Sequence, residues 1–223
     1  MSTENHSYKL GGSLAIAIGI LYLLLGIMLL LSQTEGVQDY EKVLPAFSSS
    51  PAIDIVYGIA ASLIGLLALG YVPQLSKFVG SDRSAILTWV MYMALLGFAV
   101  DAVDQLRSLN ILPFLADSFV NGDAATRSAV LASQPLRWVD TTCFFRFGLP
   151  GLWILVVSII AFDSKKLNTG LCVIGFAGAG FLWLAVIGNL LQSTIVIAIG
   201  AGAAIVIGPV WNIWIGMTLI KSR

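Results

Sequence analysis

The sequence predicts an all-α polytopic membrane protein, a bundle of six transmembrane helices with a partly helical outer loop. Of the 223 residues, 58% are hydrophobic and only 11% are charged, about half the charged share that is usual in soluble domains. The mean hydropathy is +0.92, and several apolar runs reach the roughly 20 residues that a helix needs to cross a bilayer. The whole chain, 1–223, is therefore expected to form a single membrane domain.

Composition also argues against several classes of function. The net charge is zero, so there is no electrostatic case for binding nucleic acid. His6 is the only histidine and lies in the polar N-terminal tail, which argues against a bis-histidine haem, a histidine-rich metal centre or a Ser-His-Asp triad. Cys143 and Cys172 fit no metal or redox spacing. No metal site and no cofactor are expected, although a lipid or quinone could occupy the space between helices.

Apolar runs and the polar breaks between them define the spans, which we expect at about 13–32, 52–72, 84–106, 141–162, 169–192 and 194–220. The first run is longer than the apolar part of a signal peptide, so we expect it to be retained. Pro51 suits the first turn of the second helix. The last apolar stretch is far too long for one span, so the polar residues between Asn189 and Thr194 are expected to form the turn of a helical hairpin.

The connections differ in character. Segment 33–51 is expected to be an acidic loop, and residues 73–83 an amphipathic connector. The outer loop, 107–140, contains a turn signal followed by a short helix at 124–133, for which Asp123 is the expected N-cap. Seven Lys and Arg residues lie on the side of the termini and four on the other side, which predicts cytoplasmic termini in a multi-pass protein of a cell membrane, with a bacterial inner membrane as the expected location.

Polar residues are expected to gather at the outer ends of several spans. Asp101, Asp104 and Arg107 are spaced three apart and so share one helical stripe, and Arg137 and Asp140 repeat that spacing. Because charge in hydrocarbon is costly, we expect Arg146 to pair with Asp101 or Asp104 in an outward-facing polar cavity. The full candidate cluster is Asp54, Asp101, Asp104, Arg107, Arg137, Asp140, Arg146, Asn189 and Gln192. A purely structural role, in which the charges lock helix ends together, is favoured over a ligand or ion pocket, and a catalytic site is the least favoured; no catalytic residue is assigned.

Small residues form a second feature of the last two spans. Gly175 and Ala179, and Gly200 and Ala204, have the four-residue spacing that lets helix backbones approach closely. Packing within the hairpin is the simpler explanation, and a homodimer or larger membrane complex is the alternative. The aromatic residues mostly suit the membrane interfaces, although tyrosines within the spans could line a pocket.

The chain resembles a known group of proteins in its layout. A glycine-led first span, an acidic outer loop, a long third loop with a short helix, and the ending Pro209-Val210-Trp211-Asn212-Ile213-Trp214-Ile215-Gly216 look like the uncharacterised six-span integral membrane proteins common in bacteria. The resemblance implies a six-helix bundle and no particular reaction.

Three classes of function remain open from the sequence. The favoured one is a non-enzymatic accessory or binding component that holds a lipid or another apolar ligand between its helices. The alternatives are a small-solute or ion transporter or channel, which should show related halves and broken helices, and an intramembrane enzyme that uses aspartate carboxylates.

Overall fold

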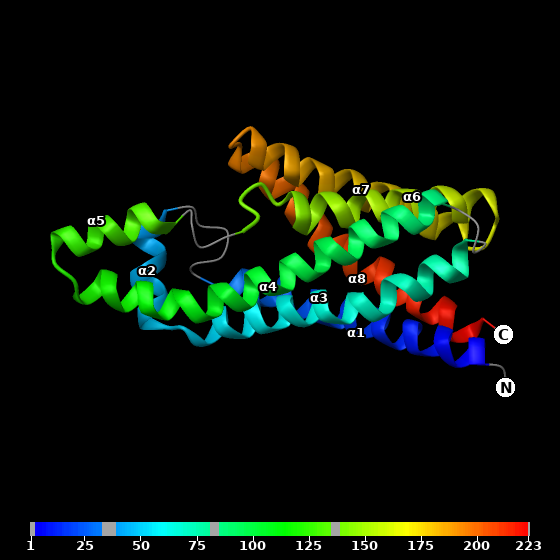
Figure 1. Ribbon diagram of the computed structural model, residues 1–223, viewed down its shortest axis with the longest axis horizontal. Helices are drawn as coiled ribbons and strands as arrows, with labels where there is room; N and C mark the ends of the chain where they lie inside the picture. The colour runs from blue at the N-terminus through cyan, green and yellow to red at the C-terminus, as the bar shows by residue number, and fades with distance from the viewer. Residues whose placement is uncertain (1–2, 33–38, 81–84, 135–138, 223) are drawn as a thin grey trace.

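Long helices make up the structure, as the hydropathy predicts. The computed structural model describes residues 3–32, 39–80, 85–134 and 139–222. In chain order, the helices of these ranges are α1 (Thr3–Leu31), α2 (Tyr40–Ser49), α3 (Ala52–Val79), α4 (Ala85–Asn121), α5 (Ala124–Ser133), the π-helical turn η2 (Phe144–Gly148), α6 (Leu149–Asp163), α7 (Thr169–Leu190) and α8 (Thr194–Lys221), shown in Figure 1.

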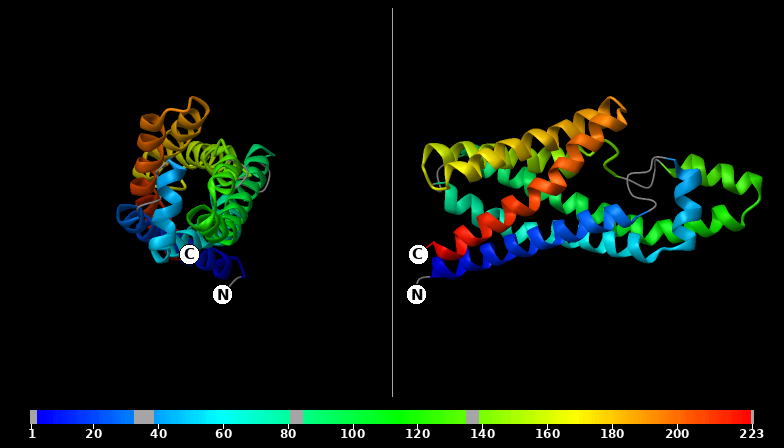
Figure 2. Two further views of the ribbon diagram at one scale, coloured as in Figure 1. Left: turned by 90° about the vertical axis from the view of Figure 1, so that its left-hand side faces the viewer. Right: turned by 180° about the vertical axis from the view of Figure 1, so that it is seen from behind.

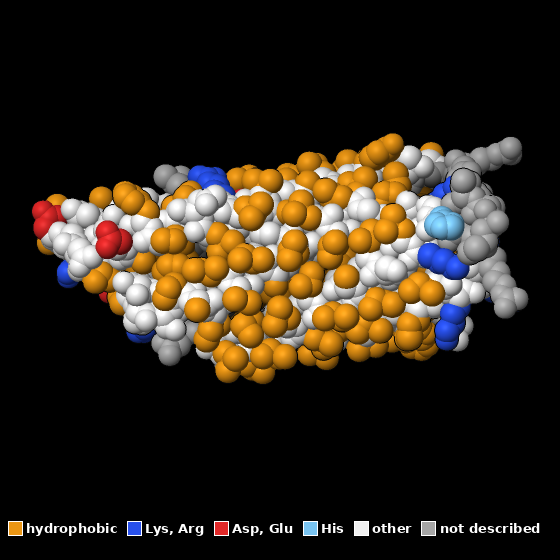
Figure 3. Space-filling view, turned by 90° about the horizontal axis from the view of Figure 1, so that it is seen from below, with side chains coloured by type: hydrophobic (Ala, Val, Ile, Leu, Met, Phe, Trp, Pro, Cys, Tyr) orange, Lys and Arg blue, Asp and Glu red, His pale blue; other side chains and the backbone are white. Residues whose placement is uncertain are grey.

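Six segments of the described chain are long and apolar enough to cross a membrane: α1, α3, α4, η2 with α6, α7 and α8. On the face shown in Figure 3, hydrophobic side chains cover the middle of the molecule, and charged side chains lie toward its two ends. The prediction of an all-α, multi-pass membrane protein is thereby confirmed.

The six spans form a closed ring in chain order. α1 packs against α3, α3 against α4, α4 against α6, α6 against α7 and α7 against α8, and α8 returns to pack against α1. Viewed end-on, the helices surround a common axis (Figure 2). Both termini lie at one end of the bundle, which we call the terminal end, and α2 and α5 lie at the other, the loop end (Figure 1).

Two contacts of the ring depend on glycine. A Cβ added to Gly12 would lie 2.7 Å from the carbonyl oxygen of Gly216, and one added to Gly216 would lie 2.6 Å from that of Gly12. A Cβ on Gly200 would lie 2.5 Å from a backbone nitrogen of α7. These distances leave no room for a side chain, so the backbones of α1 and α8, and of α7 and α8, approach closely. Gly200 therefore serves packing within the hairpin, whereas a homodimer through the Gly/Ala faces stays a prediction.

The third span is longer than the sequence predicts. α4 does not end near residue 106 but continues to Asn121, so the first part of the expected outer loop, 107–140, is helical. Leu112 and Ala116 lie one turn apart, are 7% and 1% exposed, and belong to a small apolar core shared with α2 and α5. Burial of this second apolar stripe explains why the helix continues past the membrane.

The loop end contains one expected helix and one that was not expected. α5 confirms the predicted short helix, and the Asp123 carboxylate accepts a hydrogen bond from the backbone N–H of Thr126 at 2.8 Å. α2 lies within segment 33–51, which was expected to be a loop. Its Leu44 and Phe47 pack into the same small core as Leu112, so tertiary burial makes this segment helical.

α3 also continues beyond its predicted end. The sequence indicates a connector from Pro73, but the helix runs through this proline to Val79. Leu75, Ser76 and Val79 of this last part are buried, and the Ser76 hydroxyl accepts a hydrogen bond from the indole N–H of Trp153 on α6 at 2.9 Å. The extension therefore forms part of the packed terminal half of the ring.

Candidate functional site

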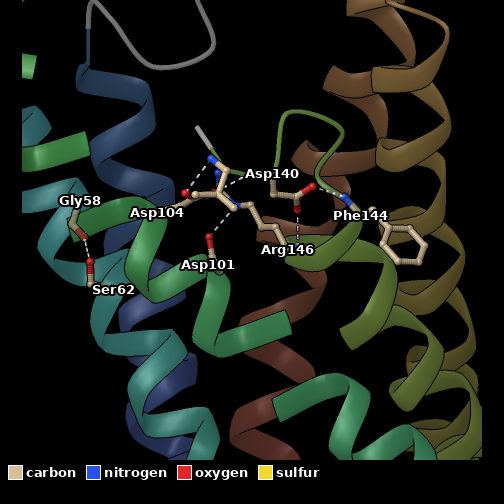
Figure 4. Close-up of polar contacts among 8 residues, drawn as sticks. Gly58, Ser62, Asp101, Asp104, Asp140, Phe144 and Arg146 are labelled. Atoms are coloured by element: carbon tan, nitrogen blue, oxygen red, sulfur yellow. Dashed lines mark hydrogen bonds and ion pairs between the residues drawn. The ribbon is translucent and has the colours of Figure 1, made fainter. Parts of the chain in front are cut away.

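An ion pair lies at the loop end of the ring, between α4 and the turn η2. The Nε atom of Arg146 lies 3.2 Å from Oδ1 of Asp101, and the two side chains are 25% and 13% exposed (Figure 4). One turn further along α4, in the amide orientation that its neighbours require, the oxygen of Gln105 accepts hydrogen bonds from Nη1 and Nη2 of Arg146 at 3.2 and 3.0 Å. The ring of Phe147 lies 5.2 Å from the guanidinium carbon, close enough for a cation–π interaction. Arg146 is thus held in place by the side chains around it.

Asp140 fixes the backbone on which Arg146 sits. Its two carboxylate oxygens accept hydrogen bonds from the backbone N–H groups of Phe144 and Arg146, each at 2.9 Å (Figure 4). These are N–H groups of the first turn of the fourth span, which have no partner within the helix. Cys143, just before this turn, has φ 58°, a left-handed conformation that turns the chain into η2. Asp140 is therefore a cap that sets the position of Arg146.

Asp104 ties the preceding connection to α4. Its oxygens accept hydrogen bonds from the backbone N–H groups of Val139 and Asp140 at 2.9 and 3.0 Å, and it is 4% exposed. The two aspartates of the predicted i, i+3 pair therefore have different roles. Asp104 positions Asp140, Asp140 positions the backbone of Arg146, and Arg146 pairs with Asp101.

The other predicted site residues are placed less centrally. Asp54 accepts a hydrogen bond from the hydroxyl of Ser32 at 2.7 Å and so links the end of α1 to the start of α3. Arg107 is exposed on α4, and Gln192 is exposed in the α7–α8 turn with φ 53°. Arg137 lies outside the described residues. Asn189 donates a hydrogen bond from its amide nitrogen to the carbonyl of Ala185 at 2.9 Å and borders both of the cavities described next.

A large, mostly apolar cavity lies inside the ring at the loop end. Its volume is about 480 Å³, within the roughly 300–1,000 Å³ typical of small-molecule sites. We call it the chamber. Its walls come from α1, α3, α4, α7 and α8, and from η2. Its lining residues include Tyr22, Tyr57, Asp101, Arg146, Asn189 and Gly202.

The chamber owes part of its volume to small residues on α8. Ala198, Ala201, Gly202 and Ala204 all line it, and a Cβ on Gly202 would meet no atom within 4 Å. From the sequence, the Gly/Ala stripe of this helix is expected to serve packing, with a homodimer face as the alternative. Packing describes Gly200, but the stripe was not expected to line a cavity as well. The sequence does contain one indication of such a cavity: the small residues of α8 occupy more than one face of the helix.

A smaller polar cavity, the vestibule, lies next to the chamber. It measures about 190 Å³ and is lined by Tyr40, Asp101, Asp104, Asp140, Thr141, Cys143, Arg146 and Asn189. Asp101, Cys143, Arg146 and Asn189 line both cavities. The ion pair therefore marks the boundary between a polar entrance and an apolar interior.

Beyond the chamber, the terminal half of the ring contains a hydrophobic core. In the described part of the chain, Leu75, Leu171, Ile215 and Leu219 are 0% exposed and belong to one continuous hydrophobic core. This arrangement can hold a molecule that is apolar along its body and polar at one end, because each part finds a matching environment.

Comparisons of the chain with protein-family models, curated proteins and solved structures gave no match. Within the described residues, no group of three or more His, Cys, Asp or Glu side chains is arranged to hold a metal ion. The chamber and the ion pair at its boundary form the candidate functional site.

Proposed function

We propose that this protein is a membrane binding protein that holds an amphipathic molecule, a lipid or a quinone, inside its helix ring. The single observation that supports this most is the chamber of about 480 Å³ with the Arg146–Asp101 pair at its polar boundary. The apolar tail of such a ligand would fill the chamber and exclude water from its walls, and the polar end of the ligand would lie at the ion pair.

The shape of the interior favours binding over transport. A solute path needs polar groups along its length, with sites near the midplane that open to either side. In the described residues, the charged groups that line the two cavities gather at the loop end, and the terminal half is a packed apolar core. A cavity with its charged groups at one end and an apolar core beyond the other suits a molecule that enters and leaves by the same route or from the bilayer.

The carboxylates favour binding over catalysis as well. Both oxygens of Asp104 and both oxygens of Asp140 accept backbone hydrogen bonds, so these groups support the fold. Asp101 is paired with Arg146, so its carboxylate already has a partner within the protein.

The Lys and Arg distribution supports an orientation for this proposal. Cytoplasmic termini would direct the vestibule away from the cytoplasm, so the polar entrance would open on the outer side of a bacterial inner membrane. Such an accessory protein would then present or store its ligand on that side.

Filling the chamber tests the proposed function directly. Gly202 lines the chamber and an added Cβ there meets nothing within 4 Å, so Gly202→Leu adds side-chain volume at the chamber wall. Gly180→Leu is the matched control, because its Cβ also meets nothing and it lies on an exposed face of α7. Native mass spectrometry of protein released in gentle detergent, with lipid extraction of the same sample, should find a stoichiometric lipid or quinone in the wild type and in Gly180→Leu. We expect Gly202→Leu to lose it. Equal retention in both variants, or a bare wild-type protein, would contradict the proposal.

A further inference from the structure

Two small cavities adjoin the chamber. The first, of about 40 Å³, shares Phe98, Arg146 and Phe147 with it. The second, of about 50 Å³, lies between α6, α7 and α8 and shares Ala204 with the chamber. We call these two spaces the deep cavities, because residues that line them lie closer to the terminal end.

The deep cavities extend from the terminal side of the chamber. On α8, the lining of the chamber ends at Ile205, and the lining of the second deep cavity runs from Ala204 to Asn212. On α1, which runs in the opposite direction, the chamber is lined as far as Tyr22, and the first deep cavity adds Ile18. From Ile205 to Asn212, α8 rises by about 10 Å at 1.5 Å per residue. The deep cavities therefore extend the lined interior by about this length.

Two side chains lie where the chamber and the deep cavities meet. Tyr22 of α1 and Leu182 of α7 line all three spaces. The ring of Tyr22 reaches α8, since a Cβ added to Gly208 would meet three atoms of this ring at 3.4, 3.5 and 3.6 Å. Leu182 lies against α6, where a Cβ added to Gly151 would lie 3.2 Å from the Cβ of Leu182. These two side chains therefore occupy the junction between a wide space and two narrow ones.

We propose that Tyr22 and Leu182 limit the length of the apolar tail that the chamber accepts. This inference rests on the proposed function and adds a specificity to it. A ligand whose polar end lies at the Arg146–Asp101 pair directs its tail toward the terminal end, where the two side chains lie. The tail can continue only if they no longer separate the chamber from the deep cavities. An acyl chain of a lipid and an isoprenoid tail of a quinone are both subject to this limit.

The limit should be visible in the affinity of ligands that differ only in tail length. Each methylene group that moves from water into an apolar chamber strengthens binding by about fourfold, whereas a methylene group that cannot pass the junction gains no such contact. In the wild type, affinity should rise with tail length and level off at a limiting length. In Tyr22→Ala, the chamber joins the deep cavities, so we expect the limiting length to increase by about 10 Å.

Competition between probes of different tail length, measured by native mass spectrometry, tests the inference. One series of probes is phosphatidylglycerol with saturated acyl chains of increasing length, and the other is menaquinone with an increasing number of isoprenyl units. The series that binds identifies the source of the tail. Tyr22→Leu is measured beside Tyr22→Ala, because leucine keeps an apolar side chain in contact with its neighbours. It should increase the limiting length by a smaller amount.

Two further variants control for a general loosening of the helix ring. The three atoms nearest to a Cβ on Gly208 all belong to the Tyr22 ring, so Gly208→Leu added to Tyr22→Ala fills space that the ring leaves. This double variant should return the limiting length to that of the wild type. Tyr92→Ala removes the same kind of side chain from an exposed position on α4 and should leave the limiting length unchanged.

The outcomes separate this inference from the proposed function. A longer limiting length in Tyr22→Ala that the double variant reverses supports the inference, whichever series of probes binds. If Tyr22→Ala and Tyr22→Leu have the limiting length of the wild type, or if the double variant keeps the longer one, the inference is overturned. Binding of a probe that Gly202→Leu abolishes leaves the proposed function intact in that case. If neither series binds the wild type, the proposed function fails, and this inference fails with it.

Discussion

At the scale of single residues, Arg146 is the side chain on which the fold and the proposed site both depend. It makes an ion pair with Asp101, its guanidinium donates to Gln105, and its own backbone N–H is held by Asp140. A guanidinium that is only partly exposed to water needs several partners, because an unpaired charge in such a place is costly. The same arrangement presents a cation to both the vestibule and the chamber.

Removing Arg146 should therefore have two separable effects. Breaking a fully buried ion pair costs about 3–5 kcal/mol, and because the Arg146 side chain is 25% exposed we expect Arg146→Ala to cost about 2 kcal/mol. Thermal melting in detergent measures this loss, and adding Asp101→Ala should restore part of it by removing the stranded carboxylate. Lys166→Ala, at an exposed position in the α6–α7 turn, is the control and should melt like the wild type.

Ligand retention distinguishes a binding role of the Arg146–Asp101 pair from a purely structural one. If the Arg146 variant loses the lipid or quinone that co-purifies with the wild type, the pair belongs to the binding site. If it melts at a lower temperature but retains the ligand fully, the pair only locks α4 to the fourth span, and its part in the proposed function is refuted.

At the scale of elements, the cap on α5 makes a prediction about pH. The backbone N–H of Thr126 donates to the Asp123 carboxylate and lowers the pKa of that carboxyl below its ordinary value of 3.8. A group whose pKa is lower in the folded state stabilises the fold above its unfolded pKa, and that contribution is lost as the pH falls through the folded pKa. We expect α5 to be protected from hydrogen exchange at pH 5 and to become less protected below about pH 4, after correction for the intrinsic exchange rate.

Asp123→Asn is the matched control for that measurement, because asparagine caps helices without a titrating carboxyl. In this variant, α5 should show the same protection from hydrogen exchange at pH 5 and below about pH 4. If α5 of the wild type is equally protected at pH 5 and below about pH 4, the ionised carboxylate of Asp123 does not stabilise the helix.

The elements also show what the sequence can and cannot predict. Hydropathy located the six spans, because each needs about 20 apolar residues. It did not show that α4 continues to Asn121. The last part of this helix depends on burial of Leu112 and Ala116 against α2 and α5, and hydropathy contains no information about such packing partners.

The site was predictable only in part for a similar reason. The cost of charge near hydrocarbon indicated that Arg146 pairs with Asp101 or Asp104, and the structure shows that the partner is Asp101. The chamber depends on the sizes and directions of side chains from several helices, which no local pattern in one helix contains.

At the scale of the whole molecule, the chamber exists because the ring closes. The first and last spans of the chain meet along α1 and α8, and both contribute walls to the chamber, through Tyr22 and Leu25 on one side and Ala201 and Gly202 on the other. One tight point between them is the reciprocal contact of Gly12 with Gly216. The retention of a ligand should therefore depend on two glycines that lie far from it, near the terminal end.

Gly216→Ala tests this dependence. The added Cβ would lie 2.6 Å from the carbonyl oxygen of Gly12, so α1 and α8 must separate, and overpacking of this kind typically costs about 1–3 kcal/mol. We expect a lower melting temperature in detergent together with faster loss of the bound lipid or quinone. Gly202→Ala, on the same helix but with open space around the added Cβ, should leave the melting temperature unchanged. If Gly216→Ala melts and retains ligand like Gly202→Ala, the contact between the first and last spans does not hold the chamber closed, and the remaining contacts of the ring must do so.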